Sequence, residues 1–229
     1  MAYYQDRQTS VGELLNGTFR ELLAIKRELA IYFAVFFVVG LLTDLVSPIR
    51  GVSAFAAFCG YFVGQYWLYR EALTRGGIMV DERFKVFSLF FMAVLLAFPI
   101  SIGLNIFYLP GILLASKWIM APTFLVAERD DLFKAMGKSW RASDNNMWSI
   151  AGAFTVLTIL WVCIFMASIA LAAGYEALLG TLGSFGTELE NSSIFWLGIH
   201  TFPVLLLGLS ISAYRALGDD ETSVAKVFE

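Results

Sequence analysis

The residue best placed to do chemistry in this sequence is Lys117, because it stands in an otherwise apolar stretch, residues 112–120. Inside a bilayer a charged side chain costs a few kcal/mol and is kept only with a partner or a purpose. Three interpretations stay open. Lys117 pairs with Asp44 as a clamp between two membrane spans, snorkels toward the headgroups, or binds an anion or lipid phosphate in a cavity between helices. Asn105 would add a hydrogen bond to such a clamp or ligand.

The other titratable residues do not form a catalytic constellation. His200 is the only histidine, so a histidine-rich metal site is excluded, and we expect an interfacial or hydrogen-bonded core residue. Among the acids, Asp44 and Glu176 fall toward the outside of the predicted membrane, and Glu71 and Glu128 toward the inside. Carboxylates separated in this way do not make the pair that a hydrolase needs. We therefore expect a protein that is not an enzyme, with neither a cofactor nor a metal.

The composition indicates a membrane protein. Of the 229 residues, 59% are hydrophobic and 15% are charged, whereas soluble domains are about 45–50% apolar and about 25% charged. The two cysteines, Cys59 and Cys163, lie in apolar runs and are expected to be small buried hydrophobes. The first apolar run begins near Leu29, which is too late for a secretory signal peptide.

The apolar runs predict an all-α, polytopic membrane helix bundle with six transmembrane helices and two amphipathic interfacial helices. A span needs about 20 residues, and the long charge-free run 86–116 is divided at Pro110 and Gly111, which favour a turn. The predicted spans are 29–46, 52–69, 86–109, 112–127, a stretch within 147–173, and 194–214. Three regions follow: a cytoplasmic tail with an amphipathic helix over 1–28, a transmembrane domain over 29–217, and an acidic cytoplasmic tail over 218–229.

The distribution of basic residues sets the predicted orientation. Of the 16 Lys and Arg residues, all but Arg50 and Lys117 fall on one side of this partition, and the segment 174–193 on the other side carries none. Basic residues are enriched in cytoplasmic loops of membrane proteins. The sequence therefore predicts that both termini are cytoplasmic.

Two segments outside the spans have an amphipathic pattern. The first begins with Ser10 and Glu13 at the spacing of a capping box, and we expect this helix to lie along the inner leaflet. Its apolar face comprises Val11, Leu14, Leu15, Thr18, Leu22 and Ile25. The second, 130–142, has Phe133, Met136 and Trp140 on one face, and a basic stripe of Lys134, Lys138 and Arg141. The stripe predicts anchoring to anionic headgroups, with a specific lipid site as the alternative.

One stretch resembles a known family. The pattern comprises Leu109-Pro110-Gly111-Ile112, Lys117-Trp118, Ala121-Pro122, Glu128, Ala135 and Ser139-Trp140. It resembles the YciC-like and glycerophosphodiester phosphodiesterase membrane-domain families over residues 109–141, although the family usually has Arg where this chain has Lys117. The resemblance implies the membrane part alone, in a bacterial inner membrane. Only a short tail follows the last predicted span, so no catalytic domain is expected here.

Two functional classes follow from these observations. The first is an integral membrane protein that associates with lipid, or a scaffolding or accessory subunit in envelope or membrane-complex organisation. The alternative is a small transporter or permeation unit with an anion or lipid headgroup site at Lys117. The expected partners are membrane phospholipids, with anionic lipid at the cytoplasmic face, and other membrane subunits or a second copy, but not nucleic acid. The spacing of Gly60 and Gly64 favours close helix packing within the chain over dimerisation.

Overall fold

The computed structural model describes residues 8–45, 50–78, 85–106, 108–128, 130–179 and 193–218, with helices throughout and no strand in these ranges. The helices are α1 (Val11–Ala24), α2 (Lys26–Leu45), α3 (Arg50–Arg75), α4 (Val86–Ile106), α5 (Tyr108–Trp118), α6 (Ala121–Ala127), α7 (Leu132–Ala142), α8 (Met147–Leu179) and α9 (Ser193–Leu217), with a 3₁₀ turn at Asp144–Asn146 before α8. The all-α prediction is confirmed for the described part of the chain. Most of the predicted acidic tail, residues 219–229, lies outside it.

Four stretches of the described chain are long and apolar enough to cross a membrane: Val86–Ile106, Tyr108–Ala127, Asp144–Leu171 and Leu197–Leu217. These agree with the third to sixth predicted spans. The first two predicted spans, in α2 and α3, are not among them. The side chains at 41–45 of α2 lie outside the described residues, and α3 carries Gln65 and several tyrosines that lower its mean hydropathy. The membrane class is thus supported, and the count of six spans stays a prediction.

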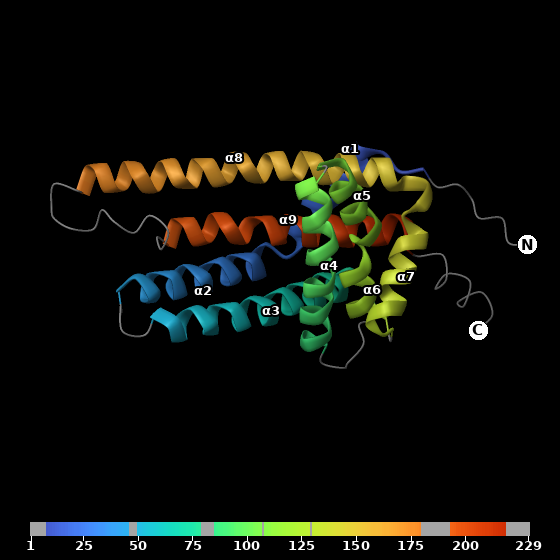
Figure 1. The fold of residues 1–229 in the computed structure, drawn as a ribbon. Coiled ribbons are helices and arrows are strands. Elements are labelled where there is room, and N and C mark those ends of the chain that lie inside the picture. The colour runs from blue at the N-terminus through green and yellow to red at the C-terminus, as the bar shows by residue number, and fades with distance from the viewer. Residues whose placement is uncertain are drawn as a thin grey trace, which may run out of the picture.

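The helices run in two directions (Figure 1). The long helices α2, α3, α8 and α9 lie lengthwise beside one another, with α9 in contact with each of the other three. The helices α4, α5, α6 and α7 run crosswise to them, near the end where α8 begins and α3 and α9 finish. The sequence analysis does not predict this crosswise direction of α4 to α7.

Helix α1 packs against α9, and its position along the inner leaflet stays a prediction. The predicted capping box is confirmed: Glu13 N donates to Ser10 Oγ over 3.2 Å, and Ser10 N donates to Glu13 Oε2 over 2.8 Å. Most of the predicted apolar face is buried, including Leu14, Thr18, Leu22 and Ile25. The close approach requires Gly17, where a Cβ would lie 2.1 Å from Ser212 Oγ on α9.

The hairpin between α4 and α5 turns earlier than predicted. The sequence predicts the turn at Pro110 and Gly111, but α4 ends at Ile106 and α5 begins at Tyr108. Pro110 then falls in the first turn of α5, where a missing N–H leaves no intrahelical bond unmade. The helices touch closely because a Cβ on Gly103 would lie 2.8 Å from the Gly111 Cα.

The predicted fourth span is two short helices. Pro122 lies in the first two positions of α6, and its ring and missing N–H interrupt a continuous helix. The chain therefore breaks at Ile119–Met120, between α5 and α6.

Two smaller expectations have opposite outcomes. Packing of the glycine pair within the chain is confirmed for Gly64, where a Cβ would lie 2.8 Å from the Tyr32 ring. The burial of the cysteines is wrong, because Cys59 and Cys163 are both exposed. Outward-facing positions of a membrane helix are themselves apolar, so an apolar run does not distinguish the two faces.

Candidate functional site at the charged end of the bundle

Lys117 lies near the C-terminal end of α5 and is paired inside the protein. Its Nζ forms an ion pair with Asp144 Oδ1 at the start of the segment leading into α8. The Lys117 side chain is 11% exposed and that of Asp144 is 56% exposed. The ammonium also lies 5.3 Å from the centroid of the Trp140 ring, within the range of a cation–π interaction. The positive charge is therefore compensated by α7 and by the beginning of α8.

Asp144 takes the role that the sequence interpretation gave to Asp44. The Asp44 side chain lies outside the described residues, and the C-terminal end of α2 is far from α5 (Figure 1). The acid that pairs with Lys117 is 27 positions further along the chain. The spacing of the two residues in the sequence did not indicate this pair. Their contact depends on how the chain turns through α6 and α7, which lie between them.

The backbone of Lys117 is held as well as its side chain. The last carbonyl groups of a helix have no intrahelical donor, and Ser139 Oγ donates to the Lys117 carbonyl over 2.8 Å. Ser143 Oγ lies 3.4 Å from the same oxygen. The rings of Trp118 and Trp140 pack with centroids 5.5 Å apart. We call this group the α5–α7 clasp: Lys117, Trp118, Ser139, Trp140, Ser143 and Asp144.

A second ion-pair cluster joins α6 to α7. Lys138 Nζ pairs with Glu128 Oε2 and lies 2.8 Å from Asp130 Oδ2, while Lys134 Nζ lies 2.6 Å from Asp130 Oδ1. Burial alone would lower the pKa of Lys138, but the carboxylates of Asp130 and Glu128 outweigh it and raise the pKa above its usual range. Burial would likewise raise the pKa of Asp130, yet the bonds from Lys134 and Lys138 hold it below its ordinary value. Tyr214 of α9 donates to Glu128 Oε1 over 3.3 Å.

Lys85, which sequence reasoning did not single out, secures the start of α4 to the same cluster. Its buried ammonium donates to the carbonyl of Leu125 over 2.9 Å and to that of Glu128. A cation at the C-terminal end of a helix is stabilised by the carbonyl dipoles there. Lys85 thereby holds the start of α4 against the C-terminal end of α6.

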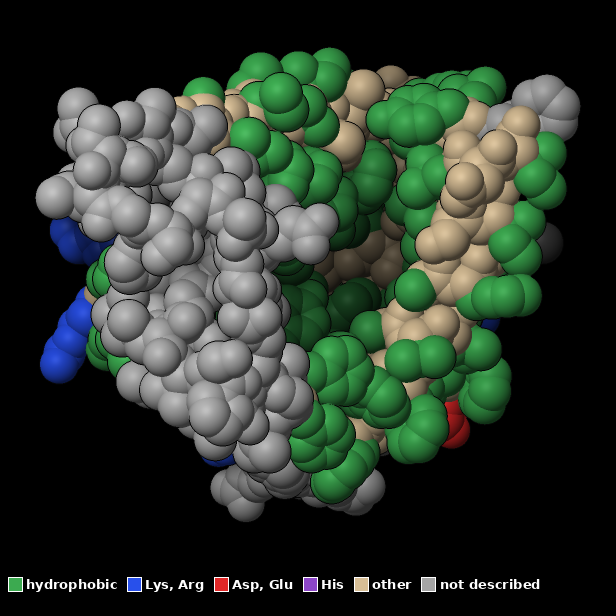
Figure 2. All heavy atoms as spheres, turned by 60° about the vertical axis from the view of Figure 1, so that its left-hand side comes forward, with side chains coloured by type: hydrophobic (Ala, Val, Ile, Leu, Met, Phe, Trp, Pro, Cys, Tyr) green, Lys and Arg blue, Asp and Glu red, His purple; other side chains and the backbone are tan. Residues whose placement is uncertain are grey.

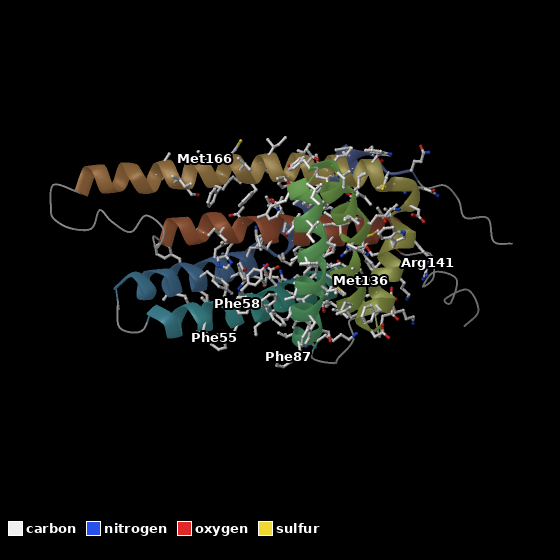
Figure 3. The ribbon with its side chains drawn as sticks, viewed as in Figure 1. Phe55, Phe58, Phe87, Met136, Arg141 and Met166 are labelled. Carbon is white, nitrogen blue, oxygen red and sulfur yellow. The ribbon has the colours of Figure 1, made fainter. Side chains whose placement is uncertain are left out.

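The predicted basic stripe is only partly on the surface. Lys138 is held by two carboxylates, whereas the Lys134 side chain is 61% exposed and Arg141 is exposed. On the same outer surface Phe133 is 74% exposed and Trp140 is 41% exposed. Figure 3 shows Arg141 at the end of the molecule where α7 lies.

Other predicted site residues are not drawn into the clasp. Asn105 is exposed and donates to the Ser101 carbonyl on its own helix over 2.8 Å. Pro110 and Gly111 serve the hairpin, and Pro122 sets the break before α6. These residues shape the path of the chain and supply no chemical group to the site.

His200 is a buried, hydrogen-bonded core residue, one of the two environments expected for it. Its Nδ1 lies 3.1 Å from the Tyr32 hydroxyl, which accepts a bond from Gln65 Nε2 over 3.1 Å. Because the hydroxyl accepts from Gln65, its own proton is left for His200. The Phe36 ring packs against the imidazole with centroids 4.0 Å apart. This cluster ties α2, α3 and α9 together in the middle of the bundle.

A polar pocket of about 430 Å³ lies where the beginning of α1 meets the end of α9, and it is lined by Gln8, Thr9, Glu13, Arg20, Ser212 and Arg215 among others. Its charged groups are engaged within the protein: Glu13 caps α1, and Arg215 Nε lies 3.1 Å from Glu21 Oε1. The pocket places the first described residues and the last turn of α9 at the same end of the molecule.

Among the described residues there is no group of three or more His, Cys, Asp or Glu side chains that could hold a metal ion. No family model, no curated protein and no solved structure matches this chain. The geometry of the site is that of ion pairs and aromatic contacts that join helices.

Proposed function

We propose that this chain is a non-enzymatic, multi-pass protein of the bacterial inner membrane that associates with anionic lipid through the outer face of α7. An even number of crossings with both termini in the cytoplasm is part of the proposal. It is supported by the shared location of residue 8 and the last turn of α9 beside one pocket, and by the excess of basic residues on that side.

The outer face of α7 carries the proposal. Ala135 and Ser139 are fully buried against the protein, and the exposed side presents Phe133, Trp140 and Arg141 together. Aromatic rings and basic groups on one exposed face are typical of a helix at the membrane interface. A basic residue near an anionic surface contributes about 1 kcal/mol of attraction.

The attraction should depend on fewer basic residues than the sequence pattern suggested. Lys138 is occupied by Glu128 and Asp130, and Lys134 shares Asp130. Arg141 is the remaining member of the stripe, and we expect it to contribute most to the preference for anionic lipid.

The experiment uses the full chain in lipid nanodiscs, with Cys59→Ala and Cys163→Ala to remove the native thiols. A nitroxide at Phe133→Cys should report the headgroup–acyl boundary, and Arg141→Gln should lower the ratio of anionic to zwitterionic lipid that co-purifies. Arg20→Gln, at an exposed base on α1, is the matched control and should change that ratio less. A label at Phe133 in bulk water, or equal losses in the two arginine variants, would contradict the proposal.

The alternative, a transporter with an anion site at Lys117, is less well supported. The ammonium already faces Asp144 and Trp140, so an anion would have to displace a carboxylate of the protein. We also propose that the resemblance of residues 109–141 to the YciC-like family reflects in part the α5–α7 clasp, because four of the residues that carry it, Lys117, Trp118, Ser139 and Trp140, contact one another there. That resemblance supports a shared way of joining helices and gives no ground for assigning a catalytic activity.

A further inference from the structure

Two apolar helices of this protein point in directions that one flat bilayer cannot accommodate as spans. Both Val86–Ile106 of α4 and Asp144–Leu171 of α8 are long and apolar enough to cross. Yet α4 runs crosswise to α8 and to the other lengthwise helices (Figure 1). If one direction follows the membrane normal, the other lies in the membrane plane.

The crosswise direction is fixed by contacts at several points. Phe90 of α4 meets α3 with its ring 5.0 Å from that of Phe62 and 6.0 Å from that of Phe58, which are one turn apart. Such a meeting at one place is typical of helices that cross. At the base of α4, Lys85 is bound to the end of α6, and the Lys117–Asp144 pair fastens α5 to the start of α8.

Polarity along the lengthwise helices shows which direction is the normal. Figure 1 shows α4, then α5 and α6, then α7, in order toward the end of the bundle. Helix α4 contains no charged residue, α5 contains only Lys117, and α7 contains three basic residues. The last turn of α3, with Arg75, and the last turn of α9, with Arg215, lie toward the α7 end (Figure 1). Charge therefore increases along the lengthwise axis, as it does from hydrocarbon to headgroups.

The opposite orientation would place charge in hydrocarbon. Helix α5 has 11 residues and is about 17 Å long at 1.5 Å per residue. If the hairpin crossed a core about 30 Å thick, the end of α5 would be near its middle. The Asp144 side chain, 56% exposed, would then face acyl chains, where a carboxylate is strongly unfavourable.

We infer that the α4–α5 hairpin lies in the plane of the membrane, beneath α7, and enters the bilayer without crossing it. Packed helix axes are about 8–10 Å apart, and α4 contacts α5, α6 and also α7, so α4 lies below the level of α7 and within the hydrocarbon core. A helix can lie there because its backbone groups are bonded internally. Four helices would then cross, and the cytoplasmic position of both termini in the proposed function is unchanged.

The surface that this arrangement exposes is suited to acyl chains. Along α4 the exposed side chains include Phe87, Phe98 and Ile106, and on α8 they include Met166. Figure 3 shows Phe87 and Met166 pointing away from the bundle. Figure 2 shows a hollow lined by hydrophobic side chains, and the described charged side chains in that view lie at the outline of the molecule. Lipid chains are the apolar molecules that a membrane supplies there, and we assign them as the occupant.

Depth measurements at matched positions test the inference. In the full chain with Cys59→Ala and Cys163→Ala, single nitroxides are placed on α4 at Phe87, Phe98 and Ile106, where exposures of 73%, 72% and 66% leave room for a label. Controls on α8 are at Val156 and Leu171, 44% and 66% exposed. Depth comes from the ratio of collisions with oxygen to collisions with a water-soluble nickel chelate.

The two arrangements give different profiles. We expect one depth for all three α4 labels, and a change of about 22 Å between the two α8 controls at 1.5 Å per residue. A change of about 28 Å between Phe87 and Ile106 would overturn the inference, since the hairpin would then span. So would a constant depth along α8. Low oxygen collision rates at all α4 labels would mean that a second copy, and not lipid, covers this surface. The Phe133 label reports the proposed function separately.

Discussion

The two partners of the Lys117–Asp144 pair should respond unequally to mutation, because they are buried to different extents. The Lys117 side chain is 11% exposed and that of Asp144 is 56% exposed. Asp144→Asn leaves a buried ammonium without a carboxylate, and removal of one partner from a buried pair costs about 3–5 kcal/mol. Because the Asp144 side chain is half exposed, we expect Asp144→Asn to lower the free energy of unfolding by about 3 kcal/mol, the lower end of this range.

Lys117→Met should cost less. The Asp144 carboxylate that remains is already half exposed and can be solvated. The loss of its attraction to Lys117 should therefore cost as little as the loss of a surface ion pair, about 0.2–1 kcal/mol. The lost contact with Trp140 adds about 0.5–1 kcal/mol. Methionine keeps most of the apolar stem, and the total should therefore be about 1 kcal/mol.

The assay is unfolding of the purified protein in mild detergent, followed by intrinsic tryptophan fluorescence. The double variant Lys117→Met/Asp144→Asn should be more stable than Asp144→Asn alone, because the stranded charge is gone. Lys26→Met, at an exposed lysine of α2, is the control and should change stability by less than about 0.5 kcal/mol. Equal losses in the two single variants, or a larger loss for Lys117→Met, would refute the reasoning. Loss of a co-purified anion from Lys117→Met with unchanged stability would instead favour the ligand site.

Two further predictions concern the α6–α7 cluster and α1. Because folding lowers the pKa of Asp130 below 3.8 and raises that of Lys138 above 10.5, their stabilisation is complete between those values. This stabilisation is lost as pH falls through the folded pKa of Asp130 or rises through that of Lys138. The unfolding midpoint should therefore decrease at both acid and alkaline pH, and Asp130→Asn should weaken the decrease at acid pH. Gly17→Ala should destabilise by about 1–3 kcal/mol by displacing the Ser212 hydroxyl from its buried bond, measured by the same unfolding assay. Gly12→Ala on the same helix meets nothing within 4 Å and should be neutral or stabilising by up to about 1 kcal/mol; equal effects of the two would contradict the packing argument.

The sequence by itself determined the class of protein and the local boundaries of several helices. Backbone polar groups must be hydrogen-bonded within the protein in lipid, so a span is a helix of sufficient length with apolar side chains. Such apolar runs mark four of the predicted spans. The Ser10–Glu13 capping box was predictable because it depends on two residues in one turn. The break before α6 was not predicted, since 112–127 was taken as one span, although Pro122 in the first positions of α6 is a local signal for it.

Only the tertiary structure decided which way each helix runs and which charges meet. An apolar helix in the membrane plane and one along the normal have the same composition, so periodicity could not separate α4 from α8. From the sequence alone, more than one acidic residue could have been the partner of Lys117. The crosswise path of α5, α6 and α7 brings Asp144 to it instead of Asp44. The same path turns Lys138 inward to Asp130. Ion pairs between distant segments depend on the direction of every helix between them, which local sequence does not encode.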